Sequence, residues 1–379
     1  MFSMNIYSLI GAVIAAVIVI GLISSGSLAV PETDTIALGV IAPLSGDAAA
    51  YGEPVRNAVS IAVDEINESG GIDGRLVEPI YEDGKCNGKD AASAAQKLVN
   101  VDKVHYIVGP VCSAEAFGLI PVTSTENVFV FSPGSSAPKL AGITPYFMRT
   151  YPNDNITGVA LADYLSMSHK TAAIITEATD YGLGIKEVFV AQAEKNGMHV
   201  VSAEDFTTST ADFRTLIARV KSANPDVIFI NPQTSANLLR VAKEVRELGI
   251  NAAFAAVVFN DPETVGAGTA VEGMTLIGTP GLSIEEKGTA FVDSYTKLYG
   301  TPSYAFFAGA AYDNVYLIKQ AIEAVGDDTD KVQAYLHGLK NYDGTLGSYR
   351  FDQNGDIVGL PSVVQRIVSG KLITLPYTK

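Results

Sequence analysis

Residues 104–136, VHYIVGPVCSAEAFGLIPVTSTENVFVFSPGSS, contain two short apolar runs on either side of a helix-like stretch. The runs Val104–Val108 and Val128–Phe131 are rich in β-branched and aromatic residues, and each stops at Gly or Ser. Such runs are typical of strands that are buried on both faces of a parallel sheet. The helix-like stretch begins near Ser113. The segment therefore predicts a strand, a crossover helix and a second, parallel strand.

The same alternation extends in both directions along the chain. Before residue 104, the expected strands are Ile36–Ile41 and Leu76–Tyr81, and the expected helices are Pro54–Ser69 and Ala91–Val101. A second series begins near Thr171, with strands at Ala172–Thr176, Val200–Val201, Val227–Ile230 and Ala252–Phe259 and helices at Gly184–Asn196, Phe213–Ala223 and Ala236–Leu248. The two series predict an α/β protein with two open parallel sheets, each covered by helices on both faces. A length of 379 residues agrees with two domains.

The C-terminal part has a different pattern. Helix-like stretches Glu285–Leu298 and Ala308–Ala324 precede the strand-like runs Tyr349–Asp352, Ile357–Val368 and Leu372–Leu375. Asn354-Gly355 and Ser369-Gly370 are turn signals between these runs. No low-complexity linker separates the two series, which favours a hinge made of several short crossings over a single tether.

The first 29 residues contain no charged side chain. Their apolar stretch, Leu9–Ile23, matches the core of a signal peptide and is shorter than the roughly 20 residues that span a bilayer. Small residues at Ser27 and Ala29 mark a cleavage site after Ala29. The segment lacks a basic residue before its apolar core, so an uncleaved anchor from about Ile6 remains an alternative. We expect residues 1–29 to be a signal peptide or an N-terminal anchor, and the rest to be periplasmic or extracellular.

Composition and motifs exclude several functional classes. The net charge of −15 argues against a nucleic-acid surface, because phosphate binding depends on Lys and Arg. The four histidines are scattered, and Cys86 and Cys112 have no CxxC partner, so no metal site is expected. Nucleophile-elbow, Walker and complete dinucleotide motifs are missing, and we expect neither a cofactor nor catalysis. The two cysteines form a disulfide if the protein is exported, and are buried free thiols if it is cytosolic.

Three small polar loops follow strands of the first series: Pro43–Gly46, Gly109–Ser113 and Ser132–Ser136. In open parallel sheets such loops meet along the carboxyl edge, where ligands bind. Ser113 is placed to cap a helix, where amides and the helix dipole favour an anion. A carboxylate could be held there by Ser113 and the backbone of Gly134–Ser136. The alternative is that these residues only cap helices and form turns.

At these loops the sequence resembles type I periplasmic binding proteins, in particular the leucine/isoleucine/valine-binding branch of ABC-transporter receptors. The resemblance extends from about Asp34 to the C-terminus. The segments that carry it are Gly39–Gly46 with Tyr51-Gly52, Ala62–Asn67, Gly70-Gly71-Ile72, Gly109–Ser113, Ser132–Pro138, Phe147–Thr150, Asp180–Gly182, Ala311–Asp313 and Phe351–Asp356. Each segment is a weak signal, whereas their order and spacing together are specific for the superfamily.

The resemblance implies two Rossmann-like lobes that are joined by three crossings and close around a ligand. The first lobe is expected to comprise residues 34–152 and 280–350, and the second 153–279 and 354–379. It also implies a Cys86–Cys112 disulfide. The residues that match the family's ligand site are Tyr51, Val111, Ser113, Gly134, Ser135, Ser136 and Tyr181: Ser113 and Gly134–Ser136 hold a carboxylate, Tyr51 and Val111 line the first lobe, and Tyr181 closes from the second.

Two positions depart from the amino-acid receptors. Val258 aligns where they place an acidic residue against the ligand ammonium, with Asp261 three residues later as a substitute. Gln233 aligns where they have an aromatic residue. Without an acidic partner, a buried ammonium would cost several kcal/mol. Amino acids remain the first expectation, and an amide, a urea-like compound or an organic acid is the alternative.

The expected function is that of an exported, monomeric receptor that delivers a small polar ligand to the membrane subunits of an ABC permease. A membrane-tethered ligand sensor with the same closing lobes is a second hypothesis. An α/β enzyme that uses the same cleft is a third, and the lack of acid, base and nucleophile motifs counts against it.

Overall fold

The computed structural model describes residues 35–257, 259, 261–283 and 285–377. The leader that is predicted to be a signal peptide or anchor, and Val258, lie outside the described residues. In the described part of the chain, no helix is both long enough and apolar enough to cross a membrane. The elements below belong to the unit that starts at Ile36.

The first sheet has five strands in the order β2-β1-β3-β4-β5, and all neighbours are parallel. The strands are β1 (Ile36–Ala42), β2 (Val77–Asp83), β3 (Tyr106–Val108), β4 (Phe129–Ser132) and β5 (Phe147–Arg149). Successive residues face opposite sides: Val40 and Val108 belong to one apolar core, and Ile41 and Ile107 to another. Helices therefore cover both faces, as predicted.

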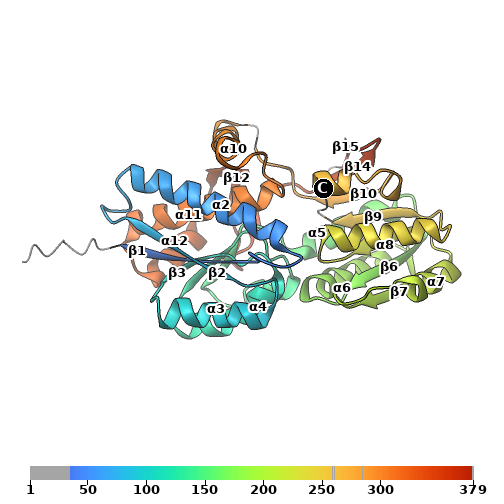
Figure 1. Ribbon diagram of the computed structural model, residues 1–379, viewed down its shortest axis with the longest axis horizontal. Coiled ribbons are helices and arrows are strands. Elements are labelled where there is room, and N and C mark those ends of the chain that lie inside the picture. The colour runs from blue at the N-terminus through green and yellow to red at the C-terminus, as the bar shows by residue number, and fades with distance from the viewer. Residues whose placement is uncertain (1–34, 258, 260, 284, 378–379) are drawn as a thin grey trace, which may run out of the picture. The chain divides into compact units, whose positions relative to one another are not determined.

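The helices around this sheet are α2 (Ala49–Glu68), α3 (Gly88–Asn100), α4 (Ser113–Thr125), α10 (Glu286–Tyr299), α11 (Ala305–Val325) and α12 (Thr329–Gly338). Figure 1 shows α2 and α11 on one face and α3 and α4 on the other. A short 3-10 helix, Pro138–Leu140, follows β4. Because β4 ends at Ser132, the predicted ligand loop lies at the carboxyl edge of this sheet.

The second sheet has seven strands in the order β15-β14-β10-β9-β8-β6-β7. Five are parallel: β6 (Thr171–Glu177), β7 (His199–Phe206), β8 (Val227–Asn231), β9 (Ala253–Val257) and β10 (Thr275–Gly278). At one edge, β14 (Val363–Val368) and β15 (Lys371–Leu375) add an antiparallel hairpin. The helices are α5 (Asp154–Ser166), α6 (Asp180–Lys195), α7 (Arg214–Ala223), α8 (Ser235–Glu247) and α9 (Pro262–Val265), with a 3-10 turn at Gly268–Ala270.

A small antiparallel sheet follows α12 and corrects one prediction. Its strands are β11 (Tyr342–Gly344), β12 (Gly347–Phe351) and β13 (Ile357–Val358). The expected single strand Ile357–Val368 is wrong, because it is divided between β13 and β14. Gly359 has a φ of +109° and Pro361 has no N–H to donate, so the backbone turns between the two strands.

The chain passes from one sheet to the other between β5 and α5, between β10 and α10, and between β13 and β14. A buried ion pair joins the end of β5 to the residue that precedes β13. Arg149 donates from Nε to Asp356 Oδ1 at 2.6 Å and from Nη2 to Oδ2 at 3.1 Å. The Arg149 amide also donates to Gly355 O. The boundaries of the two expected lobes remain a prediction.

Candidate ligand-binding site

A cavity lies where loops that follow strands of both sheets approach α11. It brings together seven residues that the sequence predicts for the site: Tyr51, Val111, Ser113, Gly134, Ser136, Tyr181 and Gln233. The other residues of its wall are Cys112, Tyr151, Val257, Phe259, Tyr304 and Phe307. The wall thus combines a serine end with a large aromatic and apolar surface.

The serine end is organised by hydrogen bonds within the loops. Ser113 Oγ accepts from the amides of Ser136, at 3.2 Å, and Ala137, at 3.0 Å. The amides of Gly134 and Ser135 donate to Ser132 Oγ. The three predicted amides are therefore already hydrogen-bonded inside the protein. What Ser113 can offer a carboxylate is the hydrogen of its hydroxyl group, held in place by two amides.

Close packing explains the glycine of this loop. A Cβ atom at Gly134 would lie 2.8 Å from Val111 Cγ1 and 2.9 Å from Val111 O. Glycine therefore lets the two ligand loops touch. Ser135, in contrast, is fully buried behind the wall, where its hydroxyl faces the carbonyl groups of Pro110 and Cys112.

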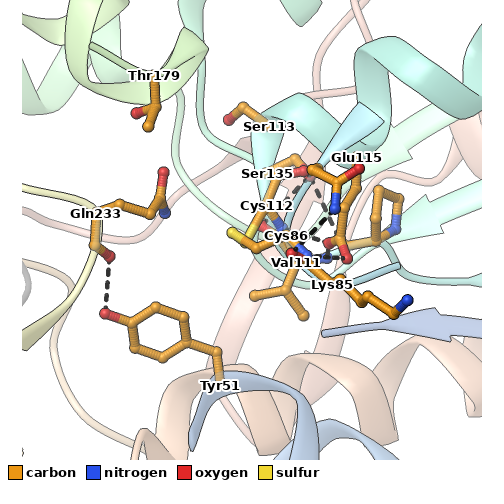
Figure 2. Close-up of a disulfide and its surroundings, with 12 residues drawn as sticks. Tyr51, Lys85, Cys86, Val111, Cys112, Ser113, Glu115, Ser135, Thr179 and Gln233 are labelled. Atoms are coloured by element: carbon orange, nitrogen blue, oxygen red, sulfur yellow. Dashed lines mark hydrogen bonds between the residues drawn. A yellow bond between two sulfur atoms is a disulfide. The ribbon is translucent and has the colours of Figure 1, made fainter. Parts of the chain in front are cut away.

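The Cys86–Cys112 disulfide is present and confirms the predicted pairing, with a Cα–Cα distance of 5.2 Å. Glu115, a fully buried residue that the sequence reading did not single out, connects the two cysteine loops. Its Oε1 accepts from the Cys86 amide at 3.0 Å, and its Oε2 from the amides of Cys112 at 2.9 Å and Val111 at 3.3 Å (Figure 2). This carboxyl group and the disulfide together fix the loop that carries Ser113.

A hydrogen bond connects the side of the cavity that carries Tyr51 with the side that carries Gln233. Tyr51 Oη donates to Gln233 O at 2.9 Å (Figure 2). Gln233 is held from its own side, because its amide donates to Glu177 Oε2. Gln233 thus contributes to the wall, and its carbonyl group is already bonded to Tyr51.

Asp261 belongs to the wall of a neighbouring cavity, which shares Tyr151, Tyr304 and Phe307 with the first. Its side chain caps α9 and accepts from Thr264 N, Thr264 Oγ1 and Ser235 Oγ. Ser235 Oγ also shares a 2.5 Å hydrogen bond with Tyr304 Oη. Because the single Ser235 hydrogen goes to Asp261, Tyr304 is the donor in this bond. The Asp261 carboxylate is therefore well supplied with donors.

The aromatic residues Tyr151, Phe259, Tyr304 and Phe307 are the main part of the wall that the sequence analysis missed. They stand in loops or at the start of α11, where an aromatic residue is indistinguishable from an ordinary core residue. None of the described residues that line the cavity is an acid or a base. Burial raises the pKa of Tyr51, Tyr151, Tyr181 and Tyr304, so all four hydroxyl groups stay neutral.

Glu115 predicts a pH dependence of folding. Burial raises its pKa to about 7, with Asp83 adding to the rise and the three amides opposing it. A raised carboxyl pKa means that the folded state binds the proton more tightly than the unfolded state. Its contribution to the free energy of unfolding is therefore full below about pH 4.5 and is lost as the pH rises through about 7, with an upper bound of about 3 kcal/mol.

The Glu115→Gln variant isolates this contribution. We expect the difference in unfolding free energy between wild type and variant to decrease from pH 5 to pH 7, as measured by urea denaturation. Glu126→Gln, at the exposed end of α4, is the matched control, and its difference should stay constant. A constant difference for Glu115→Gln as well would contradict the prediction.

Known proteins share this architecture over nearly the whole described chain. A sequence model of the periplasmic binding protein family matches residues 35–371. The leucine-, isoleucine-, valine-, threonine- and alanine-binding protein of Pseudomonas aeruginosa is 30% identical over 334 residues, which cover 86% of this chain and 87% of that protein.

Two solved structures are similar as well. The leucine-binding protein LivK of Thermotoga maritima has a TM-score of 0.83 at 25% identity, over 90% of this chain and 98% of that one. The branched-chain amino acid binding protein LivJ of Streptococcus pneumoniae, solved with isoleucine, has a TM-score of 0.80 at 26% identity, over 90% of this chain and 100% of that one. The resemblance and the fold expected from the sequence are thereby confirmed, and the chain belongs to the periplasmic binding protein family.

Proposed function

We propose that the chain is an exported, non-catalytic solute receptor of an ABC transporter, with a branched-chain amino acid as its ligand. The observation that carries this proposal is the composition of the cavity wall: serine hydroxyl groups at one end, and apolar and tyrosine side chains around the rest. Such a wall suits a carboxylate and an aliphatic side chain. The relatives described above, which are named for binding leucine, isoleucine and valine, support the same ligand class.

In this proposal the hydroxyl group of Ser113 donates to the ligand carboxylate, and Ser136 lines the same end of the cavity. Tyr51 and Val111 contact the aliphatic part, and Tyr181 closes over it. Since residues from both sheets line the cavity, a bound ligand stabilises the arrangement in which the two walls are close. The expected lobes move about the three crossings, and the Tyr51–Gln233 hydrogen bond belongs to the closed form.

A carboxylate without an amine is the second candidate. It is favoured by the lack of an acidic side chain among the described residues of the wall, because a ligand ammonium group there has no direct counter-charge. An amide or a urea-like compound is a further outcome of the same ligand screen.

Ser113→Ala tests the site. We expect the variant to bind leucine about 10- to 100-fold more weakly, because a hydrogen bond to a charged group contributes about 1.5–3 kcal/mol. Isothermal titration calorimetry measures the affinity, after thermal-shift screening of amino acids, amides, urea and organic acids. Ser93→Ala, on the exposed face of α3, is the control and should bind as wild type does. Unchanged affinity of Ser113→Ala would place the carboxylate elsewhere.

We further propose that the receptor acts as a monomer and that its partners are the membrane subunits of a permease. Size-exclusion chromatography with light scattering tests the first statement. The mass of the mature protein tests the form of the N-terminus: loss of residues 1–29 agrees with an exported soluble receptor, whereas their retention favours a membrane-tethered sensor.

A further inference from the structure

Asp154 is a buried carboxylate without a partner. It is the first residue of α5, directly after the cap Asn153, and is 1% exposed. Its amide donates to Ser136 O at 2.9 Å. Both of its carboxylate oxygens are buried, and no ion pair reaches either of them within the described residues; the Ser136 hydroxyl is the polar group that acts on them most strongly. Buried carboxylates are normally satisfied, so this one calls for a specific explanation.

The nearby charges do not compensate for Asp154. Arg149 is fully buried and is already paired with Asp356 through two hydrogen bonds, and its remaining Nη1 donates to the carbonyl groups of Ser135 and Ala137. Asn153 adds a further donor to Asp356. Arg149, Asp356 and ionised Asp154 together therefore carry one excess negative charge. Burying such a charge costs several kcal/mol unless a cation arrives.

Three of the four side chains that interact with the Asp154 carboxylate line the cavity. The groups that face its carboxylate are the Ser136 hydroxyl, the hydroxyl groups of Tyr151 and Tyr181, and the Arg149 guanidinium. Ser136, Tyr151 and Tyr181 all line the cavity. The carboxylate is therefore close enough to three wall residues to interact with them electrostatically, and its own backbone is bonded to the wall residue Ser136.

We propose that Asp154 is the specificity-determining residue that provides the counter-charge for the ligand's ammonium group. The site then selects zwitterionic α-amino acids over carboxylates of the same shape that lack the amine. This assignment rests on the proposed function. Asp261 and Glu177 are the competing acids. Three donors already satisfy the Asp261 carboxylate, and two donors bind Oε2 of Glu177, which makes both weaker candidates than Asp154.

The protonation of Asp154 supplies an independent readout. Burial raises its pKa to about 7, while Ser136 and Arg149 act in the opposite direction. Near neutral pH the carboxyl group is then protonated in part of the molecules. An ammonium group beside it favours the ionised form, so binding of an amino acid releases protons. A ligand without the amine releases none.

The experiment compares leucine with 4-methylpentanoate, which has the same carboxylate and side chain but no amine. Calorimetric titrations use wild type, Asp154→Asn and the matched control Asp261→Asn. We expect Asp154→Asn to lose at least 30-fold in affinity for leucine and less than 3-fold for 4-methylpentanoate. For Asp261→Asn we expect equal changes for both ligands.

Titrations at pH 7 in two buffers of different ionisation enthalpy measure proton release. Leucine should release protons from wild type and none from Asp154→Asn. Wild-type data alone decide the matter if the variant does not fold: equal wild-type affinities for leucine and 4-methylpentanoate overturn the assignment. The assignment is also overturned if Asp154→Asn loses affinity equally for both ligands, or if Asp261→Asn loses affinity for leucine alone. If wild type binds neither leucine nor 4-methylpentanoate, the proposed function itself fails.

Discussion

Arg149→Met should lower the free energy of unfolding by about 3–5 kcal/mol, because removing one partner of a buried ion pair leaves the other charge unpaired. Here the loss leaves both Asp356 and Asp154 without a cation, in a region that is closed to water. It also removes the donor to the carbonyl groups of Ser135 and Ala137, which shape the ligand loop. The end of β5 and the residue that precedes β13 would lose their ion pair.

Urea denaturation followed by circular dichroism, together with the melting temperature, measures this effect. Lys139→Met is the control: its contact with Glu187 is 3.9 Å long, and the two side chains are 79% and 75% exposed. Such a surface pair contributes about 0–1 kcal/mol. The double variant Arg149→Met/Asp356→Leu should recover part of the loss, because it removes both charges. A loss below 1 kcal/mol for Arg149→Met alone would falsify this account of the buried ion pair.

Removal of the disulfide by Cys86→Ala and Cys112→Ala should cost about 3–4 kcal/mol in the chain-entropy account, because the bond closes a loop between cysteines 26 positions apart. The variant should still fold at room temperature, since Glu115 holds the Cys86 and Cys112 amides independently of the sulfur atoms. Ligand affinity should fall less than stability does, because Ser113 keeps its bonds to the Ser136 and Ala137 amides.

Denaturation with and without a reducing agent measures the contribution of the disulfide. Wild type should become less stable on reduction, and the double alanine variant, which has no disulfide to lose, serves as the control and should not respond. Intact mass before and after reduction should differ by two hydrogen atoms. If reduction leaves the wild-type denaturation midpoint unchanged, the bond does not stabilise the fold.

The first ligand wall could be predicted from local sequence. Ser113 lies where the loop after β3 meets α4, and Gly134 and Ser136 lie in the loop after β4. Parallel strands present their carboxyl ends at one edge of the sheet. Position along the chain was therefore enough to bring these residues together. The prediction of a single strand over Ile357–Val368 failed because the alternation of apolar residues is continuous across this segment. Only the backbone at Gly359 and Pro361 separates β13 from β14.

The aromatic part of the cavity wall could not be predicted in the same way. Tyr304 and Phe307 lie more than 250 positions after Tyr51 and reach it through the packing of α11 on α2. Asp154 resembles an ordinary acidic residue in the first turn of a helix. Its burial without a partner depends on Arg149 being paired with Asp356, a residue from the far end of the chain.

The sequence by itself determined the α/β architecture, the family and the serine end of the cavity, because short-range patterns and strand ends encode these features; the disulfide followed from the resemblance to the family. Tertiary structure alone decided which aromatic side chains close the cavity, which acids are satisfied and which carboxylate is left without a counter-charge. Those properties depend on distances and burial among residues that are remote in the chain, and no local pattern records them.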